Sequence, residues 1–144
     1  MKMTITKKFS EIPFGHRQPN HSGCCRYGHG HGWSIEVTFA CIKKDENGFI
    51  IDFGKLGFLK TWIEEHLDHA FLLCASDPAL PDFQKLEAKD LFKLTVVDDC
   101  SAEGLAEYFF RTFDYLTQRE TNGRVYLTRC TVFEDSRNSA TYES

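Results

Sequence analysis

The sequence lacks the features that mark membrane-spanning, exported and repetitive proteins. It has no apolar run of about 20 residues, so no membrane-spanning helix is predicted. Its first residues lack the apolar core of a signal peptide, and a cytoplasmic location is expected. No repeat, low-complexity tract or linker interrupts residues 1–144, which we interpret as one domain because domains commonly have about 100–150 residues.

An excess of basic residues is also missing. Lysine and arginine total 17 against 21 acidic residues, and the formal net charge is −4. Because nucleic-acid-binding proteins generally present a basic surface, direct binding to nucleic acid is not expected. The 42% hydrophobic and 26% charged residues are ordinary for a folded domain that builds its core without disulfides or structural metals.

The six cysteines contain no Cys-x-x-Cys pair. This absence argues against zinc ribbons and thioredoxin-type redox motifs, and reduced thiols are expected in a cytosol. Four of the cysteines are expected to pack as small apolar side chains: Cys41, Cys74, Cys100 and Cys130.

Strand patterns occur in several segments. Apolar and polar residues alternate strictly over 33–42, and more weakly over 3–9, as in half-buried strands. A turn at Asn47-Gly48 suggests that residues 49–53 return as a strand or lead into a helix. Residues 91–97 and 125–134 are expected to form a short and a long strand.

Helical patterns occur in two segments. Apolar residues recur at helical spacing over 55–67 and again after Ser101, where Asp99 or Ser101 is the expected N-cap. Residues 70–90 contain two prolines and several acidic residues and are interpreted as a long loop with at most a helical turn. The order predicts an α+β fold with an antiparallel sheet and helices on one face.

A histidine cluster precedes the best-defined strand. His29 and His31 are two positions apart, so both side chains point to one face if the strand extends back to them. Two imidazoles on one face form half of a zinc site, and His16 is available as a third ligand. The alternatives are an ordinary surface pair of histidines and a structural zinc site that is closed by Cys24 or Cys25.

Other candidate chemical groups lie outside the cluster. Cys25 is near the histidines and Arg26, where a lowered pKa would make it a base or nucleophile, and the alternative is a small apolar side chain buried in the core. Asp68 and His69 suit acid–base chemistry, but neighbours in a strand or helix do not face each other, so the pair needs a loop geometry. Glu134 alone is an ordinary solvated carboxylate.

Six segments in the same order resemble the 6-pyruvoyltetrahydropterin synthase/6-carboxytetrahydropterin synthase family. They span nearly the whole chain and are Phe14-Gly-His-Arg17, Cys25-Arg-Tyr-Gly-His-Gly-His31, Ile51-Asp-Phe-Gly-Lys-Leu56, Leu67-Asp-His69, Ser101-Ala-Glu-Gly-Leu-Ala106 and Val132-Phe-Glu134. The resemblance implies the T-fold, a small antiparallel sheet backed by two helices. It also implies that sheets of several subunits join into a barrel, typically a homohexamer built from two trimers, with active sites between subunits.

The same resemblance implies the roles of individual residues. Zinc is expected at His16, His29 and His31, and catalysis at Cys25 together with an Asp68–His69 pair. Glu134 matches the family's pterin-anchoring glutamate, a role that suits a carboxylate accepting two parallel hydrogen bonds. Arg17 and nearby lysines are candidates for holding the substrate's phosphates.

The position of Cys25, four residues before the His-x-His pair, resembles the bacterial carboxy branch. That branch implies conversion of 7,8-dihydroneopterin triphosphate to 6-carboxy-5,6,7,8-tetrahydropterin, with release of triphosphate and acetaldehyde, in the queuosine pathway. The alternatives are the 6-pyruvoyltetrahydropterin synthase reaction on the same substrate and a non-catalytic zinc- or pterin-binding protein. The chain departs from the family pattern at Cys24, at Cys100-Ser101 and at Asp135.

Overall fold

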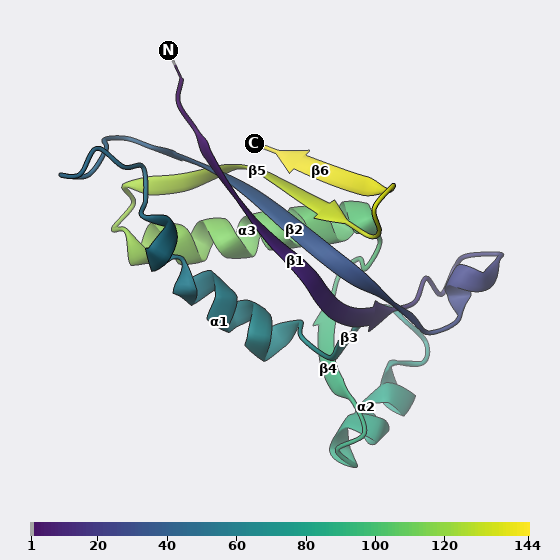
Figure 1. Ribbon diagram of the computed structural model, residues 1–144. Helices are drawn as coiled ribbons and strands as arrows, with labels where there is room; N and C mark the ends of the chain where they lie inside the picture. Colours follow the sequence, from purple (N-terminus) through teal and green to yellow (C-terminus); the bar gives the residue numbers. More distant parts are fainter. Residues whose placement is uncertain (1) are drawn as a thin grey trace.

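The computed structural model describes residues 2–144, which form six β-strands and three α-helices. The strands join in one curved sheet in the order β4-β3-β1-β2-β5-β6 (Figure 1). The strand bounds are β1 Ile5–His16, β2 His29–Cys41, β3 Ala70–Cys74, β4 Lys93–Val97, β5 Val125–Phe133 and β6 Ser139–Glu143. No helix in the described part of the chain is long and apolar enough to cross a membrane.

The sheet is mixed. β1, β2, β5 and β6 pair in antiparallel fashion, as expected, but β3 is parallel to β1 and β4 is parallel to β3. Parallel neighbours need a crossover connection, and α2 (Leu80–Ala88) supplies it between β3 and β4. The interpretation of 70–90 as a loop was therefore wrong, because β3 and α2 occupy most of it.

β1 and β2 are the two longest strands, and they pair with each other in the middle of the sheet. On β2, Trp33, Ile35, Val37 and Phe39 are fully buried, which confirms the strand predicted from their alternation. β1 extends seven residues past the predicted 3–9, up to His16, beyond a register shift between Phe9 and Ile12. This irregularity interrupts the alternation, which is why the pattern did not reveal the second half of β1.

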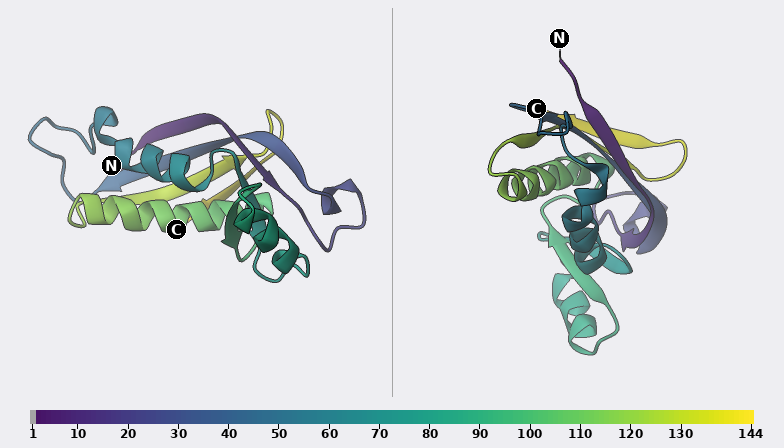
Figure 2. Two further views of the ribbon diagram at one scale, coloured as in Figure 1. Left: turned by 90° about the horizontal axis from the view of Figure 1, so that it is seen from below. Right: turned by 60° about the vertical axis from the view of Figure 1, so that its left-hand side comes forward.

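Two helices cover one face of the sheet, as predicted. α1 (Gly57–His66) and α3 (Ala102–Glu120) lie on the same side of the sheet (Figure 2), and α2 lies apart beside β4. Ser101 is the N-cap of α3 because its hydroxyl accepts a hydrogen bond from the Gly104 N–H at 3.0 Å. α3 buries Leu105, Phe109 and Phe113 against the core.

The sequence left residues 49–53 open between a return strand and an approach to a helix, and the second alternative is confirmed. The segment forms no strand and leads into a short 3₁₀ helix, Phe53–Lys55, which Asp52 caps. Ile50 and Ile51 are buried, so this apolar segment reflects contact with the core rather than strand pairing. β6 was not anticipated; it is a short edge strand with alternating half-exposed side chains.

Candidate metal centre and surrounding residues

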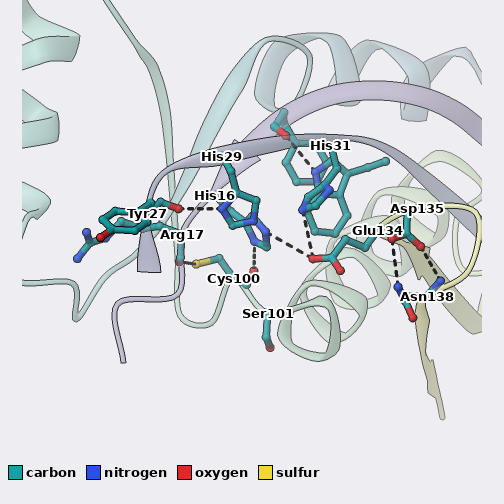
Figure 3. A network of polar contacts seen from close by, with 12 residues as sticks. His16, Arg17, Tyr27, His29, His31, Cys100, Ser101, Glu134, Asp135 and Asn138 are labelled. Carbon is teal, nitrogen blue, oxygen red and sulfur yellow. Dashed lines mark hydrogen bonds and ion pairs between the residues drawn. The ribbon is translucent and has the colours of Figure 1, made fainter. Parts of the chain in front are cut away.

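The three histidines meet where β1 ends and β2 begins. Antiparallel pairing places His16 opposite His29, and Phe14 opposite His31. One ligand atom from each imidazole lies within 4.8 Å of the others, so the three side chains could hold one metal ion (Figure 3). Trp33 packs against this cluster, and the His16 and His31 rings lie edge-on to its indole.

Backbone carbonyls orient two of the rings. The Nδ1 of His16 donates to the Cys100 carbonyl at 2.7 Å, and that of His29 donates to the Tyr27 carbonyl at 2.8 Å. Nδ1 must be the donor, because a carbonyl only accepts, so each Nε2 is left with a free lone pair. Such carbonyl partners are typical of metal-binding histidines.

The cluster satisfies two chemical requirements of a metal site. His16 Nε2 and His31 Nε2 are buried and have no hydrogen-bond partner within the described residues, and a metal ion would satisfy both nitrogens. Burial, which outweighs the Cys100 hydrogen bond, lowers the pKa of His16 below 6.5 and favours the neutral imidazole that binds metal. The donor set fits a metal ion that accepts nitrogen ligands, such as zinc.

Glu134 follows β5 and lies at the edge of the histidine cluster. Its Oε1 is 3.4 Å from His31 Nε2 and 3.6 Å from His16 Nε2. The next residue, Asp135, accepts hydrogen bonds from the backbone N–H groups of Arg137 and Asn138, and these bonds hold the pKa of Asp135 below its usual value. Asp135 therefore stabilises the β5–β6 turn, which accounts structurally for its presence.

The Cys25 loop lies beside β1. Cys25 belongs to a short 3₁₀ helix, Cys24–Arg26, and its carbonyl accepts a hydrogen bond from the Gln18 N–H at 2.8 Å. Desolvation, Cys24 and the charge of Glu134 raise the pKa of the Cys25 thiol, contrary to the lowered value expected from Arg26. The Arg26 guanidinium instead lies over the Tyr27 ring, 4.2 Å from its centroid.

Arg17 is engaged within the chain. Its Nε and Nη2 donate to the two carboxylate oxygens of Asp77 at 2.6 and 3.0 Å, and its Nη1 donates to the Arg26 carbonyl at 3.2 Å. The Asp77 side chain is fully buried between the end of β3 and α2. The pair therefore ties the Cys25 loop to the β3–α2 connection, and nothing in the sequence pattern marked Asp77 for this role.

Asp68 and His69 form the pair that the sequence suggested. His69 has a φ of +60°, and this left-handed turn between α1 and β3 brings its Nδ1 within 2.5 Å of the Asp68 carboxylate. The backbone N–H of His69 is anchored by the Pro13 carbonyl at 2.7 Å. Its side chain is 84% exposed, and no polar contact among the described residues joins the pair to the three histidines.

Comparison with known proteins identifies the class to which this fold and histidine cluster belong. The family model described as 6-pyruvoyl tetrahydropterin synthase matches residues 4–144, and the chain belongs to that family. Its fold is the T-fold of this family, a six-stranded half-barrel sheet with helices on one face. The resemblance drawn from the six sequence segments is thereby confirmed.

The curated relatives that match this chain share one name. The chain is 30% identical over 122 residues to the 6-carboxy-5,6,7,8-tetrahydropterin synthase of Aquifex aeolicus, covering 80% of this chain and 73% of that protein. It is 38% identical over 79 residues to the protein of the same name from Rickettsia bellii, covering 54% and 56% of the two chains. The chain thus spans about half the length of the Rickettsia relatives it matches.

Solved structures show the same fold. An uncharacterized protein from Wolinella succinogenes superposes with a TM-score of 0.83 at 20% identity, covering 100% of this chain and 99% of that one. The 6-pyruvoyl tetrahydropterin synthase of Caenorhabditis elegans superposes with a TM-score of 0.65 at 21% identity, covering 99% and 95%. At these identities the similarity establishes the fold alone.

Proposed function

We propose that the protein is a zinc-dependent lyase that converts 7,8-dihydroneopterin triphosphate to 6-carboxy-5,6,7,8-tetrahydropterin. The reaction takes up one water and releases triphosphate and acetaldehyde. The observation that carries the proposal is the triad of His16, His29 and His31, next to the Cys25 loop, with two buried Nε2 atoms that have no hydrogen-bond partner among the described residues. The names of the curated relatives support the carboxy reaction.

In the proposed reaction, the three histidines, Cys25 and Glu134 have different roles. Zinc held by the three histidines would supply a Lewis acid for negative charge on substrate oxygens, and its positive charge would counteract the burial that raises the pKa of the Cys25 thiol. Cys25 Sγ then takes a proton from the substrate carbon next to the hydroxyl group. Glu134 accepts hydrogen bonds from the substrate at the edge of the cluster, and its family role is anchoring of the pterin ring.

The Asp68–His69 pair completes the proton transfers. Asp68 fixes the ring orientation of His69, whose exposed Nε2 is available to donate and accept protons. Because the side chain faces solvent in one chain, we propose that it acts on the histidine cluster of a neighbouring copy. The expected assembly is a homohexamer of two trimers in the cytoplasm, with its product entering deazaguanine synthesis of the queuosine type.

One assay tests the proposed reaction. The zinc-loaded protein is incubated with 7,8-dihydroneopterin triphosphate, pterin products are identified by mass spectrometry, and acetaldehyde is measured enzymatically. We expect 6-carboxytetrahydropterin with equal amounts of triphosphate and acetaldehyde. Triphosphate without acetaldehyde would instead indicate the 6-pyruvoyl reaction, and unchanged substrate bound to the protein would indicate a pterin-binding protein without turnover.

A further inference from the structure

Two cysteines that the sequence analysis assigned to packing lie in contact with each other. Cys74 ends β3, Cys100 precedes α3, and their Sγ atoms are 3.0 Å apart although 26 positions separate them in the chain. Both residues are buried, with 7% and 0% of their surfaces exposed. A disulfide has its sulfur atoms about 2.05 Å apart, so the two sulfur atoms would have to approach each other by about 1 Å.

The pair is linked to the candidate metal centre. The Cys100 carbonyl accepts the hydrogen bond from His16 Nδ1 at 2.7 Å, and the Cys100 thiol donates to the Arg17 carbonyl at 3.1 Å (Figure 3). Cys100 thus holds the ligand residue His16 through its backbone and contacts the next residue through its side chain. Packing alone does not require two thiols at this position, because any small apolar side chain fills such a space.

One member of the pair, Cys74, lies beside a cavity that a small oxidant could enter. Cys74 lines an open cavity of about 430 Å³, together with Gln18, Asn20, His21, Ser76 and Asp99. Cys130 is a useful contrast, because it is fully buried in β5 and no other thiol contacts it among the described residues. Cys130 is therefore buried as completely as Cys100 but has no thiol partner there.

We propose that Cys74 and Cys100 form a dithiol that hydroperoxides convert reversibly to a disulfide. Hydrogen peroxide oxidises the Cys74 thiol to a sulfenic acid and leaves as water, and the Cys100 thiol then attacks the Cys74 sulfur and displaces a second water. The two sulfur atoms lose two electrons in total, and peroxide gains them. A thiol reductant restores both thiols, as is usual for regulatory disulfides in a cytosol.

The disulfide restrains the residue that holds His16. In the reduced pair, core packing and hydrogen bonds hold Cys100, whereas the disulfide would add a covalent link between the end of β3 and the residue that precedes α3. Local opening of this region becomes rarer when the two elements are linked. The oxidised chain should therefore release its metal more slowly. This coupling rests on the proposed metal site, whereas disulfide formation does not depend on it.

Peptide mapping tests the disulfide directly. The zinc-loaded protein is treated with hydrogen peroxide, quenched in acid, alkylated and digested, and the peptides are identified by mass spectrometry. We expect one cross-linked pair that contains Cys74 and Cys100, lacks two hydrogens and is reversed by dithiothreitol. The Cys130→Ala control should retain it, and the Cys74→Ser variant should lose it. Oxidation confined to Cys24, Cys25 or Cys41, with both Cys74 and Cys100 still free to alkylate, overturns the proposal.

Two measurements on the same samples test its consequences. The midpoint of thermal unfolding should rise by about 5–10 °C on oxidation, because a disulfide closing a loop of this size restricts the unfolded chain. Release of zinc to a chelator should be at least about threefold slower in the oxidised wild type, and unchanged by peroxide in Cys74→Ser. Equal or faster release with the disulfide formed overturns the coupling to His16 without affecting the proposed enzymatic reaction.

Discussion

The histidine cluster and the Asp68–His69 pair are both formed within one chain, yet their surroundings are opposite. His16 is 2% exposed, and the Cys100 carbonyl orients its ring. The side chain of His69 is 84% exposed, and its ring is oriented by a contact with Asp68. The first region is assembled by the strand pairing of a sheet, whereas the second is assembled by a single left-handed residue.

This difference suggests a division of labour between copies of the chain. A metal ion requires several ligands whose positions are fixed in advance, and neighbouring strand ends provide them. A proton carrier requires an oriented ring that reaches the substrate, and an exposed junction can present this ring to a site on a second copy. In our proposal, each site therefore combines the buried half of one chain with the exposed half of another.

Among the variants proposed here, removal of one histidine of the cluster should cause the largest loss of bound zinc and of turnover. In His29→Ala, the triad loses one of three nitrogen ligands, and we expect bound zinc to fall from about one per chain to almost none, with loss of turnover. Elemental analysis of the dialysed protein measures this directly. His66→Ala is the matched control, because His66 lies on α1 outside the cluster. Unchanged zinc in His29→Ala would refute the ligand assignment.

Replacement of Cys25 tests whether turnover can be lost while zinc binding is kept. We expect Cys25→Ala to keep its zinc and its fold and to lose turnover by about 100-fold or more, the usual contribution of a catalytic base. Zinc content, circular dichroism and the rate of triphosphate release are the measurements. Cys41→Ala, in a half-buried position on β2, serves as the control. A near-normal rate in Cys25→Ala would remove this thiol from the mechanism.

Breaking the Arg17–Asp77 pair should loosen the connection between the cluster and the Cys25 loop. Asp77→Asn removes a buried carboxylate from a partly exposed guanidinium, and we expect unfolding to require about 1–3 kcal/mol less. Cys25 should also be alkylated faster than in the wild type. Denaturant titration and timed alkylation measure the two effects. Glu107→Gln, which breaks an exposed ion pair on α3, should change neither.

Acid should weaken the buried region around His16. Burial lowers the pKa of His16, whereas the unfolded chain takes up this proton near the ordinary pKa of 6.5. The contribution of His16 to stability is therefore fully present above pH 6.5 and is lost progressively as the pH falls below that value. Denaturant titrations of the chelator-treated protein at about pH 7.5 and pH 5.5 measure the loss. It should shrink in His16→Gln and persist in His66→Gln.

The sequence allowed the convergence of His29 and His31 to be predicted because its signals are local. The alternation around Trp33 put His29 and His31 in phase with the buried face, and Ser101 was a recognisable N-cap. The groups that orient the histidine rings have no such local signal in the sequence. The Tyr27 and Cys100 carbonyls act through the backbone, so their residue types are uninformative about these contacts.

Long-range pairing explains what could not be predicted of the fold. β3 is buried along its whole length, so it lacks the alternation of a half-buried strand, and Pro81 lies in the first turn of α2, where proline is tolerated. The contact between Cys74 and Cys100 depends on where β3 ends relative to the start of α3. Side-chain periodicity contains no information about that relation.

Mixing two inactive variants tests the division of labour most directly. His29→Ala chains, which lack the metal half, and His69→Ala chains, which lack the proton carrier, are co-expressed with different tags and purified as mixed assemblies. If each site takes its two halves from different copies, a random mixture contains about a quarter intact sites and should recover about a quarter of wild-type turnover. A mixed assembly that remains as inactive as either parent would contradict the shared site.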